Sequence, residues 1–246
     1  MKQNKYDEET FFAAYEQMPR SVKGLEGAGE WHVWQALLPE LRDKSVLDLG
    51  CGYGWHCRYV REQQASSVTG IDLSEKMLQK ARENTDDPSI TYIKAPIEDI
   101  QFTDSQFDLV ISSLAFHYIA SFGAICQKVY AWLKPGGTFL FSVEHPIFTS
   151  RSEQDWYSDD QGNRLHWPVD HYQFEGIRET SFLTENVVKY HRTLSTYLND
   201  LIGSGFNIRA VKEPMPSDEL LQTVPEMKDE NRRPMFLIIS AEKGLA

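Results

Sequence analysis

The chain has 246 residues, with 25 Lys and Arg against 36 Asp and Glu, which gives a formal net charge of -11 at pH 7. This length is enough to bury the core of one α/β domain. The acidic balance argues against a nucleic-acid partner, because phosphate contacts need clustered Lys and Arg. It favours a neutral or cationic small molecule instead. The chain contains no run of eighteen uncharged apolar residues, so we expect no membrane span.

The first nine residues lack the apolar core of a signal peptide, and the cysteines give no sign of disulfides. Cys51, Cys57 and Cys126 are scattered and odd in number, without the spacing of metal ligands. Such usage is typical of a reducing compartment. We therefore expect a cytoplasmic protein without a bound metal. The sequence carries no signal for the oligomeric state.

The chain begins with two predicted helices. Residues 7–18 place Phe11, Phe12 and Tyr15 on one face, with Asp7 as a possible cap. A second helix is predicted over residues 30–41. Strands and helices then alternate, which indicates a parallel sheet covered on both faces. The predicted strands are 45–50, 68–73, 90–95, 107–114 and 137–144, and the helices begin at Tyr53 and Ser74 and cover 122–133.

The alternation stops after residue 144. Residues 145–190 are rich in aromatic and polar side chains but have little periodicity. A loop of this length in a compact domain is uncommon and is usually a functional lid. A helix is predicted again over 194–202, followed by an end hairpin of strands 207–213 and 235–241. We expect one domain with four parts: N-terminal helices (1–44), a core (45–144), a lid or substrate insertion (145–190) and a C-terminal helix with a hairpin (191–246).

The sequence VLDLGCGYG, residues 46–54, is the most informative stretch of the chain. An apolar run that breaks into alternating glycines is typical of a buried strand that turns into a helix. Glycine there lets a ligand lie against the backbone. The next strand ends in Asp72, whose carboxylate is suited to grip ribose hydroxyls. The pair predicts one half of a nucleotide-binding unit, although Trp55 replaces the third glycine of the dinucleotide fingerprint.

In these motifs the sequence resembles the class I S-adenosylmethionine-dependent methyltransferases. The likeness continues in FDLVISSL (107–114), LKPGGT (133–138) and GSGF (203–206). The resemblance implies a Rossmann-like, doubly wound sheet of seven strands, mostly parallel, in which the C-terminal strand is antiparallel. It also implies S-adenosyl-L-methionine as the cofactor.

Ligands of doubly wound sheets bind outside the carboxyl ends of the strands. Together with the family resemblance, this rule predicts which residues contact the cofactor. Relatives usually carry an acid where Pro96 stands, so the adenine contact would pass to the residues after it. Arg20 could pair with the cofactor carboxylate. The predicted cofactor residues are Asp48, Gly50, Cys51, Gly52, Asp72, Leu73, Ile97, Glu98, Ser112, Leu114 and Arg20.

Methyl transfer needs a base only when the acceptor must lose a proton, and imidazole has the best-matched pKa for that task. His145, directly after the fifth strand, is the first candidate, and His117 is the second. Tyr172, His191 and Tyr15 are candidates for the acceptor pocket. Packing or helix capping is the alternative for each of these side chains.

The predicted function is methyl transfer to a small-molecule acceptor by in-line displacement. Two alternatives stay open: a non-catalytic S-adenosylmethionine-binding protein and an NAD-dependent oxidoreductase. A nucleic-acid methyltransferase is disfavoured, because the fourth strand lacks the Pro-Pro-aromatic motif of adenine N6 enzymes and no cysteine follows a proline.

Overall fold

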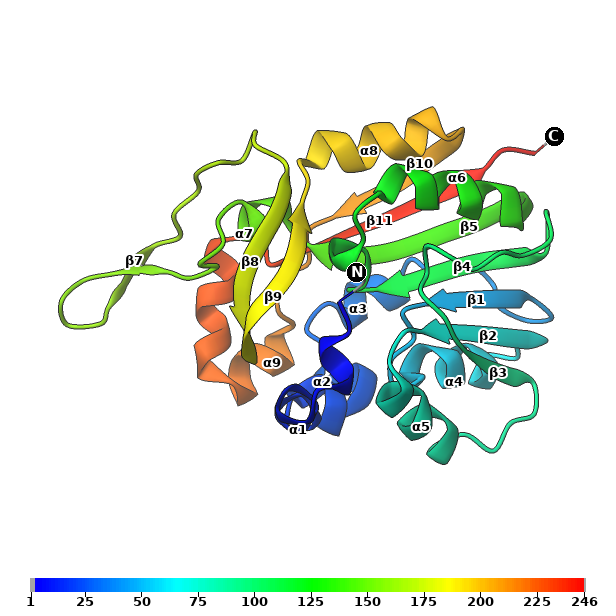
Figure 1. The fold of residues 1–246 in the computed structure, drawn as a ribbon, viewed down its shortest axis with the longest axis horizontal. Helices are drawn as coiled ribbons and strands as arrows, with labels where there is room; N and C mark the ends of the chain where they lie inside the picture. The colour runs from blue at the N-terminus through cyan, green and yellow to red at the C-terminus, as the bar shows by residue number, and fades with distance from the viewer. Residues whose placement is uncertain (1–2, 246) are drawn as a thin grey trace.

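The computed structural model describes residues 3–245 and is built on a single seven-stranded sheet (Figure 1). The strand order is β10-β11-β5-β4-β1-β2-β3. All neighbours from β5 to β3 are parallel, whereas β11 is antiparallel to both β5 and β10. The strands of this sheet are β1 (Ser45–Leu49), β2 (Ser67–Asp72), β3 (Ile90–Lys94), β4 (Phe107–Ser113), β5 (Leu133–Glu144), β10 (Phe206–Lys212) and β11 (Phe236–Lys243). The predicted seven-stranded Rossmann-like sheet is therefore confirmed.

Helices cover both faces of the sheet, as Figure 1 shows. Apolar side chains of α6 and α8 pack with one face, and those of α3, α4 and α5 pack with the other. The helices are α1 (Glu9–Glu16), α2 (Pro19–Val22), α3 (Trp31–Gln35), α4 (Trp55–Glu62), α5 (Glu75–Glu83), α6 (Phe122–Trp132), α7 (Pro146–Thr149), α8 (Leu194–Gly203) and α9 (Asp218–Thr223). Short 3-10 turns cover Lys5–Asp7, Gly24–Gly27, Phe116–Tyr118 and Pro225–Arg232.

The N-terminal helices are shorter than predicted. The first helix starts at Glu9 and has no side-chain cap, and Asp7 lies in the preceding 3-10 turn. The second predicted helix, 30–41, is reduced to α3, Trp31–Gln35. The carboxylate of Asp7 instead accepts hydrogen bonds at the start of α5, so the prediction that it caps its own helix is wrong.

Segment 145–190 has more regular structure than its sequence indicates. It contains α7, a small hairpin of β6 (Tyr157–Ser158) and β7 (Arg164–His166), and a longer hairpin of β8 (Gly176–Phe182) and β9 (Thr184–His191). Along β9 the buried positions are Val187, Lys189 and His191. Every second side chain therefore points inward, as in other strands, but two of these three side chains are basic. The sequence consequently lacks the alternation of apolar and polar residues by which a strand is usually predicted.

The sheet has two distinct ends. The carboxyl ends of the parallel strands point toward the β8–β9 hairpin and the N-terminal helices (Figure 1).

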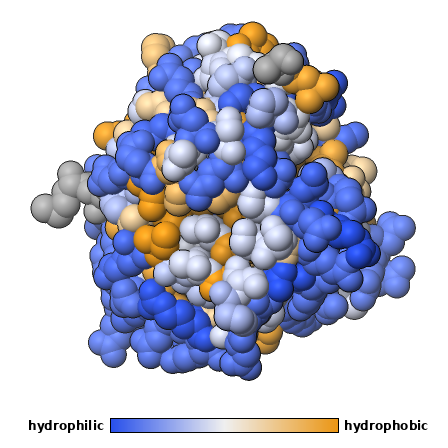
Figure 2. All heavy atoms as spheres, turned by 90° about the vertical axis from the view of Figure 1, so that its right-hand side faces the viewer, coloured by the Kyte–Doolittle hydropathy of each residue, from blue (hydrophilic) through white to orange (hydrophobic). Residues whose placement is uncertain are grey.

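The face seen from the right-hand side of Figure 1 is mostly hydrophilic, with apolar residues between the polar ones (Figure 2). Within residues 3–245, no helix combines the length and apolar character needed to cross a bilayer.

Candidate functional site

The main cavity of the protein has a volume of about 780 Å³ and lies at the carboxyl ends of the central strands. This volume is in the upper part of the range of about 300–1,000 Å³ for small-molecule sites. The walls come from the ends of β1 to β5, the N-terminal segment and the β8–β9 hairpin. The predicted site residues that line it are Gly50, Gly52, Asp72, Leu73, Ile97, Glu98, Leu114, Arg20, His117 and Tyr15.

The glycine turn after β1 forms one wall of the cavity. Gly50 and Gly52 have φ of +82° and +51°, which a residue with a side chain rarely adopts. A Cβ on Gly50 would lie 2.4 Å from the Cβ of Ala115, whereas a Cβ on Gly52 would meet no atom within 4 Å. The space beside Gly52 is therefore cavity, and the loop offers bare backbone to a ligand.

Asp48 and Cys51 support this loop from below and do not line the cavity. Asp48 is 1% exposed, and the Cys57 thiol donates a hydrogen bond of 3.3 Å to its Oδ2. Burial raises the pKa of the Asp48 carboxyl to about 7. The main-chain N–H of Cys51 donates to the carbonyl of Ile71, which ties the loop to β2. Both residues thus act on a ligand only through the loop.

Asp72 is placed at the cavity wall by the hydrogen bonds that it accepts. Its Oδ2 accepts from the N–H of Gly52 and its Oδ1 from the N–H of Ser74, each at 2.9 Å. Burial raises the pKa of this carboxyl, and the two backbone donors oppose that shift. Each oxygen keeps a further lone pair, so the carboxylate can also accept from a ligand. Leu73 lines the cavity beside it.

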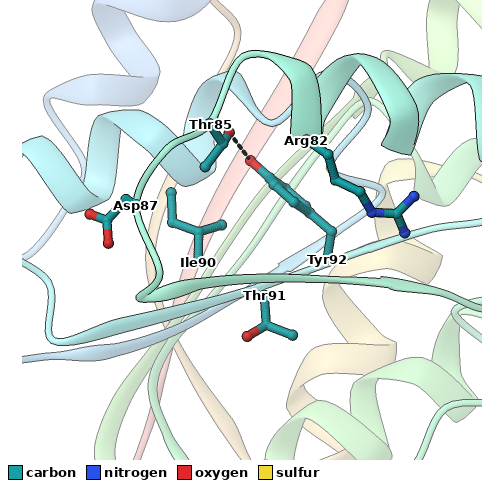
Figure 3. A pocket seen from close by; sticks show the side chains of 6 residues that line it. All are labelled: Arg82, Thr85, Asp87, Ile90, Thr91 and Tyr92. Carbon is teal, nitrogen blue, oxygen red and sulfur yellow. Dashed lines mark hydrogen bonds between the residues drawn. The ribbon is translucent and has the colours of Figure 1, made fainter.

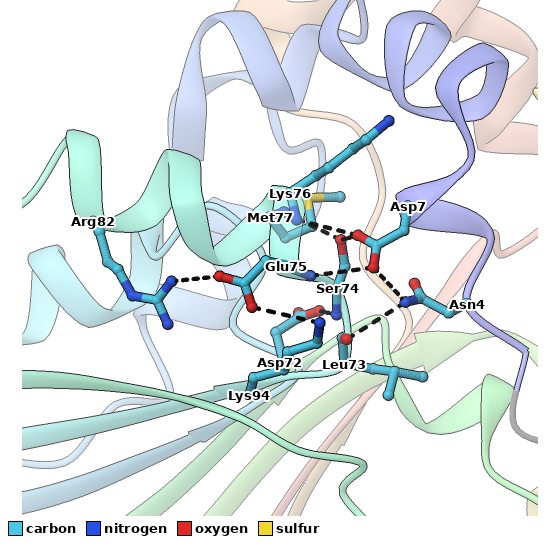
Figure 4. Close-up of polar contacts among 10 residues, drawn as sticks. All are labelled: Asn4, Asp7, Asp72, Leu73, Ser74, Glu75, Lys76, Met77, Arg82 and Lys94. Atoms are coloured by element: carbon cyan, nitrogen blue, oxygen red, sulfur yellow. Dashed lines mark hydrogen bonds and ion pairs between the residues drawn. The ribbon is translucent and has the colours of Figure 1, made fainter.

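The N-terminal segment is fastened to this strand end (Figure 4). The Ser74 hydroxyl donates to Asp7 Oδ1 at 2.5 Å, and the N–H of Lys76 donates to the same oxygen at 3.1 Å. The side chain of Gln3 pairs with the backbone of Asn186 and Val188, both at 2.9 Å. Residues 3–7 therefore connect the start of α5 to the β8–β9 hairpin across the cavity.

The ends of β3 and β4 supply a further part of the wall. Ile97 and Glu98 line the cavity after β3, and Leu114, with φ of +54°, lines it after β4. Ser112 is fully buried, and its hydroxyl donates to the carbonyl of Leu49 at 2.6 Å. It holds β4 against β1 and does not line the cavity.

Arg20 and Tyr15 reach the cavity from the N-terminal helices. Nη2 of Arg20 donates to both carboxylate oxygens of Glu30 at 3.0 Å, and Glu30 is 2% exposed. Burial opposes the charge of Arg20, but Glu30 raises its pKa overall. Tyr15 packs edge to face with Tyr6, with ring centroids 5.2 Å apart.

The two candidate bases have different environments. His117 lines the cavity, and burial lowers its pKa to about 4. His145 lies outside the cavity wall and caps α7: Nδ1 accepts from the N–H of Ile147, and Nε2 lies 2.8 Å from Glu213 Oε1. Because both of its ring nitrogens have protein partners, the expectation that His145 acts as a base is not supported.

Tyr172 and His191 also lie outside the cavity wall. His191 is fully buried, with Nδ1 at 2.8 Å from Thr149 Oγ1 and Nε2 at 2.9 Å from the carbonyl of Tyr172. The hydroxyl of Tyr172 accepts from the N–H of Leu194. These contacts join the hairpin to α7 and α8, so an acceptor-binding role for either side chain is not supported.

Sequence reasoning missed one buried ion pair at the cavity. Lys189 of β9 is 1% exposed, and its Nζ lies 2.6 Å from Glu144 Oε1 and 3.0 Å from Gln154 Oε1. Burial raises the pKa of Glu144, but Lys189, His117 and Gln154 together keep it below its usual value. In the sequence, Lys189 is marked only by its place between Val187 and His191 at alternate positions. That pattern indicates an inward-facing side chain only if residues 184–191 are already known to form a strand.

A second recess, of about 300 Å³, lies at the outer edge of the sheet beside β3 and α5 (Figure 3). Three of its polar side chains have protein partners: the hydroxyls of Thr85 and Tyr92 lie 3.0 Å apart, and Asp87 accepts from Arg61. The recess is far along the strand order from β5 and lacks the open backbone of the glycine turn. The main cavity is therefore the candidate site.

The comparisons with known proteins agree with this geometry. The family model described as a methyltransferase domain matches residues 47–141. A candidate S-adenosylmethionine-dependent methyltransferase from Listeria monocytogenes is 55% identical, with a TM-score of 0.85 over 89% of this chain and 99% of its own. An S-adenosylmethionine-dependent methyltransferase from Mesorhizobium loti is 46% identical, with a TM-score of 0.84 over 89% of this chain and 100% of its own. An uncharacterised protein from Haemophilus influenzae is 36% identical over 97% of this chain and 96% of its own.

These full-length matches, the seven-stranded sheet and the glycine turn beside Asp72 lead to one conclusion. The chain belongs to the class I S-adenosylmethionine-dependent methyltransferases, and S-adenosyl-L-methionine is its cofactor.

Proposed function

We propose that the protein transfers the methyl group of S-adenosylmethionine to a small molecule that binds in the same cavity. The observation that carries this proposal is the continuity of the cavity. One space extends from Gly52 and Asp72, at the ends of β1 and β2, to His117 and Lys189, beneath the β8–β9 hairpin. A cofactor and an acceptor can therefore lie side by side within one protein envelope.

We propose that the cofactor lies along the strand ends from β3 to β4. The bare backbone at Gly52 admits it, Asp72 accepts from its ribose hydroxyls, and Leu73, Ile97 and Glu98 flank its adenine. When bound, the cofactor supplies an electrophilic methyl group on a positively charged sulfur. Arg20 is available for the cofactor carboxylate only in part, because Glu30 already binds it in a fork.

The chain's own contribution to the reaction is alignment. Holding two reactants in the attack geometry can contribute about 7–11 kcal/mol. The side chains suited to this task come from three directions: Tyr15 from α1, His117 after β4 and Lys189 from β9. We propose that segment 145–190 acts as a lid, because its hairpin forms the outer wall and is tied to the N-terminal segment through Gln3.

A glycine substitution tests where the cofactor binds. The variant Gly52→Ala places a methyl group in the open space of the cavity, and we expect it to weaken binding of S-adenosylhomocysteine at least about tenfold by calorimetry, since the backbone could no longer touch the ligand. The matched control is Gly162→Ala, at a glycine that also has positive φ and no neighbour within 4 Å but lies outside the cavity. Equal affinity in both variants would contradict this placement.

A ligand comparison tests the class of cofactor. Wild-type protein should bind S-adenosylmethionine and S-adenosylhomocysteine and should not bind NAD under the same conditions. Methyl transfer to any small acceptor would then exclude a purely binding role. Preferential binding of NAD would overturn the proposal.

A further inference from the structure

The acceptor end of the cavity contains a buried lysine, and the reaction as proposed so far does not say which group of the acceptor it binds. Lys189 is 1% exposed and lines the cavity, although lysine is almost never fully buried unless it is paired. Its ammonium donates to Glu144 Oε1 and to Gln154 Oε1. An ammonium has three N–H groups, so one donor remains for a ligand.

His117 supplies a second donor to the same end of the cavity. Its Nδ1 accepts from the main-chain N–H of Glu144 at 3.4 Å. A neutral imidazole that accepts at Nδ1 carries its proton on Nε2. Among the residues that the structure describes, no hydrogen bond to Nε2 is formed. The ring can therefore donate its Nε2–H to a ligand. It cannot accept from one, because the lone pair on Nδ1 already accepts from the N–H of Glu144.

Charged groups of both signs surround these two donors. The charged groups that act on His117 are Glu144, Lys189, Arg192 and Arg20. Glu144 offsets Lys189, and Glu30 offsets Arg20. Arg192 is 6% exposed and is held by the carbonyl oxygens of Phe116 and Ile119; Asp200 acts on it at longer range, without an ion pair. Among the described residues Arg192 forms no close ion pair, and because it lies behind the cavity wall it adds a positive field at longer range.

Apolar rings form part of the wall at this end. Aromatic rings of Phe11, Phe182 and Phe236 line it, and they come from α1, β8 and β11. A ligand that fits these walls has an apolar body and one anionic head. The Lys189 ammonium and the His117 N–H are two donors in one cavity, and they match in number the two oxygens of a carboxylate.

Building on the proposed methyl transfer, we propose that the acceptor is a carboxylic acid with an apolar body, held through its carboxylate by Lys189 and His117 and methylated on that carboxylate. Carboxylates are ionised at neutral pH and need no base. One carboxylate oxygen forms the new bond to the methyl carbon, the sulfur–methyl bond breaks, and its electron pair stays on sulfur. The product is a methyl ester, and no proton moves.

A binding experiment tests the recognition of the anion. The full chain, saturated with S-adenosylhomocysteine, is titrated calorimetrically with octanoate and 3-phenylpropanoate and with the corresponding amides. We expect each acid to bind at least about tenfold more tightly than its amide, since hydrogen bonds to a charged group are stronger. If neither acid binds, or if the amides bind as tightly, the inference is overturned. Failure of S-adenosylhomocysteine itself to bind would instead overturn the proposed function.

Paired substitutions locate the anion site. The double variant Lys189→Gln/Glu144→Gln removes both charges together and so avoids an unpaired buried carboxylate. It should abolish the preference for acid over amide while affinity for S-adenosylhomocysteine stays the same. His117→Phe should reduce that preference several-fold. The matched control, Lys134→Gln/Asp108→Asn, removes an ion pair of 2.7 Å outside the cavity and should leave the preference unchanged. A preference that survives in both site variants would overturn the assignment.

A labelling experiment tests the atom that is methylated. S-adenosylmethionine with a tritiated methyl group is incubated with the acids that bind. A methyl ester releases volatile methanol in mild alkali, whereas ethers, amines and thioethers do not. Alkali-labile label supports the inference. Label that is stable to alkali, or no transfer to an acid that binds, overturns it.

Discussion

Two aspartates at the ends of neighbouring strands have different tasks. Asp72 faces the cavity and already accepts from two backbone N–H groups. Asp48 faces the interior beneath the glycine turn, where the Cys57 thiol donates to it. The same residue type therefore faces the cavity at one strand end and supports the loop at the other.

Replacing Asp72 should separate binding from folding. The variant Asp72→Ala removes the carboxylate that we assign to the ribose, and we expect affinity for S-adenosylmethionine to fall at least tenfold, or about 1.4 kcal/mol. Calorimetry measures the affinity, and far-ultraviolet circular dichroism checks the fold. Glu75→Ala, at an exposed acid three residues further on that does not line the cavity, is the control. Unchanged affinity in Asp72→Ala would remove this residue from the site.

Replacing Asp48 should change how stability depends on pH. Its pKa is about 7 in the folded protein because of burial, so the folded state binds more protons than the unfolded state between about pH 4 and pH 7. Stability is therefore lost as pH rises through this window, by up to about 4 kcal/mol. We expect Asp48→Asn to gain more stability over wild type at pH 8 than at pH 5, by about 2–3 kcal/mol.

Urea unfolding at the two pH values measures this difference. The comparison between pH values cancels any constant effect of the new side chain. Asp87→Asn, at an acid that is only part-buried and lies outside the main cavity, should show no such difference. An equal gain of Asp48→Asn at pH 5 and pH 8 would mean that Asp48 is ionised throughout.

The N-terminal segment and the β8–β9 hairpin act together as the outer wall of the cavity. Residues 3–7 contact the start of α5 through Asp7 and contact the hairpin through Gln3. Neither element has a large core of its own, since the hairpin is a two-stranded sheet. Two-stranded sheets are marginal alone, so these polar contacts, together with the packing of Phe11 against Phe182, hold the wall in place.

Removing one of these contacts should loosen the wall. Asp7→Ala deletes a side chain that caps α5, which costs about 1 kcal/mol of stability in comparable caps. We expect faster hydrogen exchange at residues 74–77 and in the segment 4–16, together with weaker binding of S-adenosylhomocysteine. Glu9→Ala, at an exposed acid two residues away, should change neither. Unaltered exchange at residues 74–77 would show that Asp7 does not hold the segment.

Buried histidines make the whole molecule sensitive to acid. Burial lowers the pKa of His117 to about 4 and that of His56, whose ring packs against both Trp31 and Trp34, to about 3. The unfolded chain takes up protons at these groups near pH 6.5, and the folded chain does not. Each histidine therefore lowers the stability of the protein as pH falls below about 6.5. Asp48 has the opposite effect, because its contribution to stability grows as pH falls from about 7 to about 4.

The variant His56→Gln isolates one of these contributions. Between pH 7 and pH 5 it should lose about 2 kcal/mol less than wild type, because one proton is no longer taken up on unfolding. Chemical unfolding at both pH values measures the losses. His32→Gln, at a histidine outside this aromatic cluster, should lose as much as wild type. Equal losses in the His56 variant and wild type would indicate that His56 is already charged in the folded state.

The cofactor end of this protein was predictable from the sequence because its parts are local. Residues 46–54 form a strand, a turn and the start of a helix in unbroken order, and Asp72 ends the neighbouring strand. Local spacing and the positive φ of the glycines are enough to specify such a unit. The apolar strands and their alternation with helices likewise predicted the sheet.

The acceptor end was decided only by tertiary structure. The part of the cavity where we place the acceptor combines His117, Glu144 and Lys189, which are far apart in the chain. Histidines occur throughout the sequence, and only packing distinguishes His117 in the wall from His145 at a helix cap. The β8–β9 hairpin escaped prediction because its inward positions include Lys and His, and these are stable there only through partners that the fold supplies.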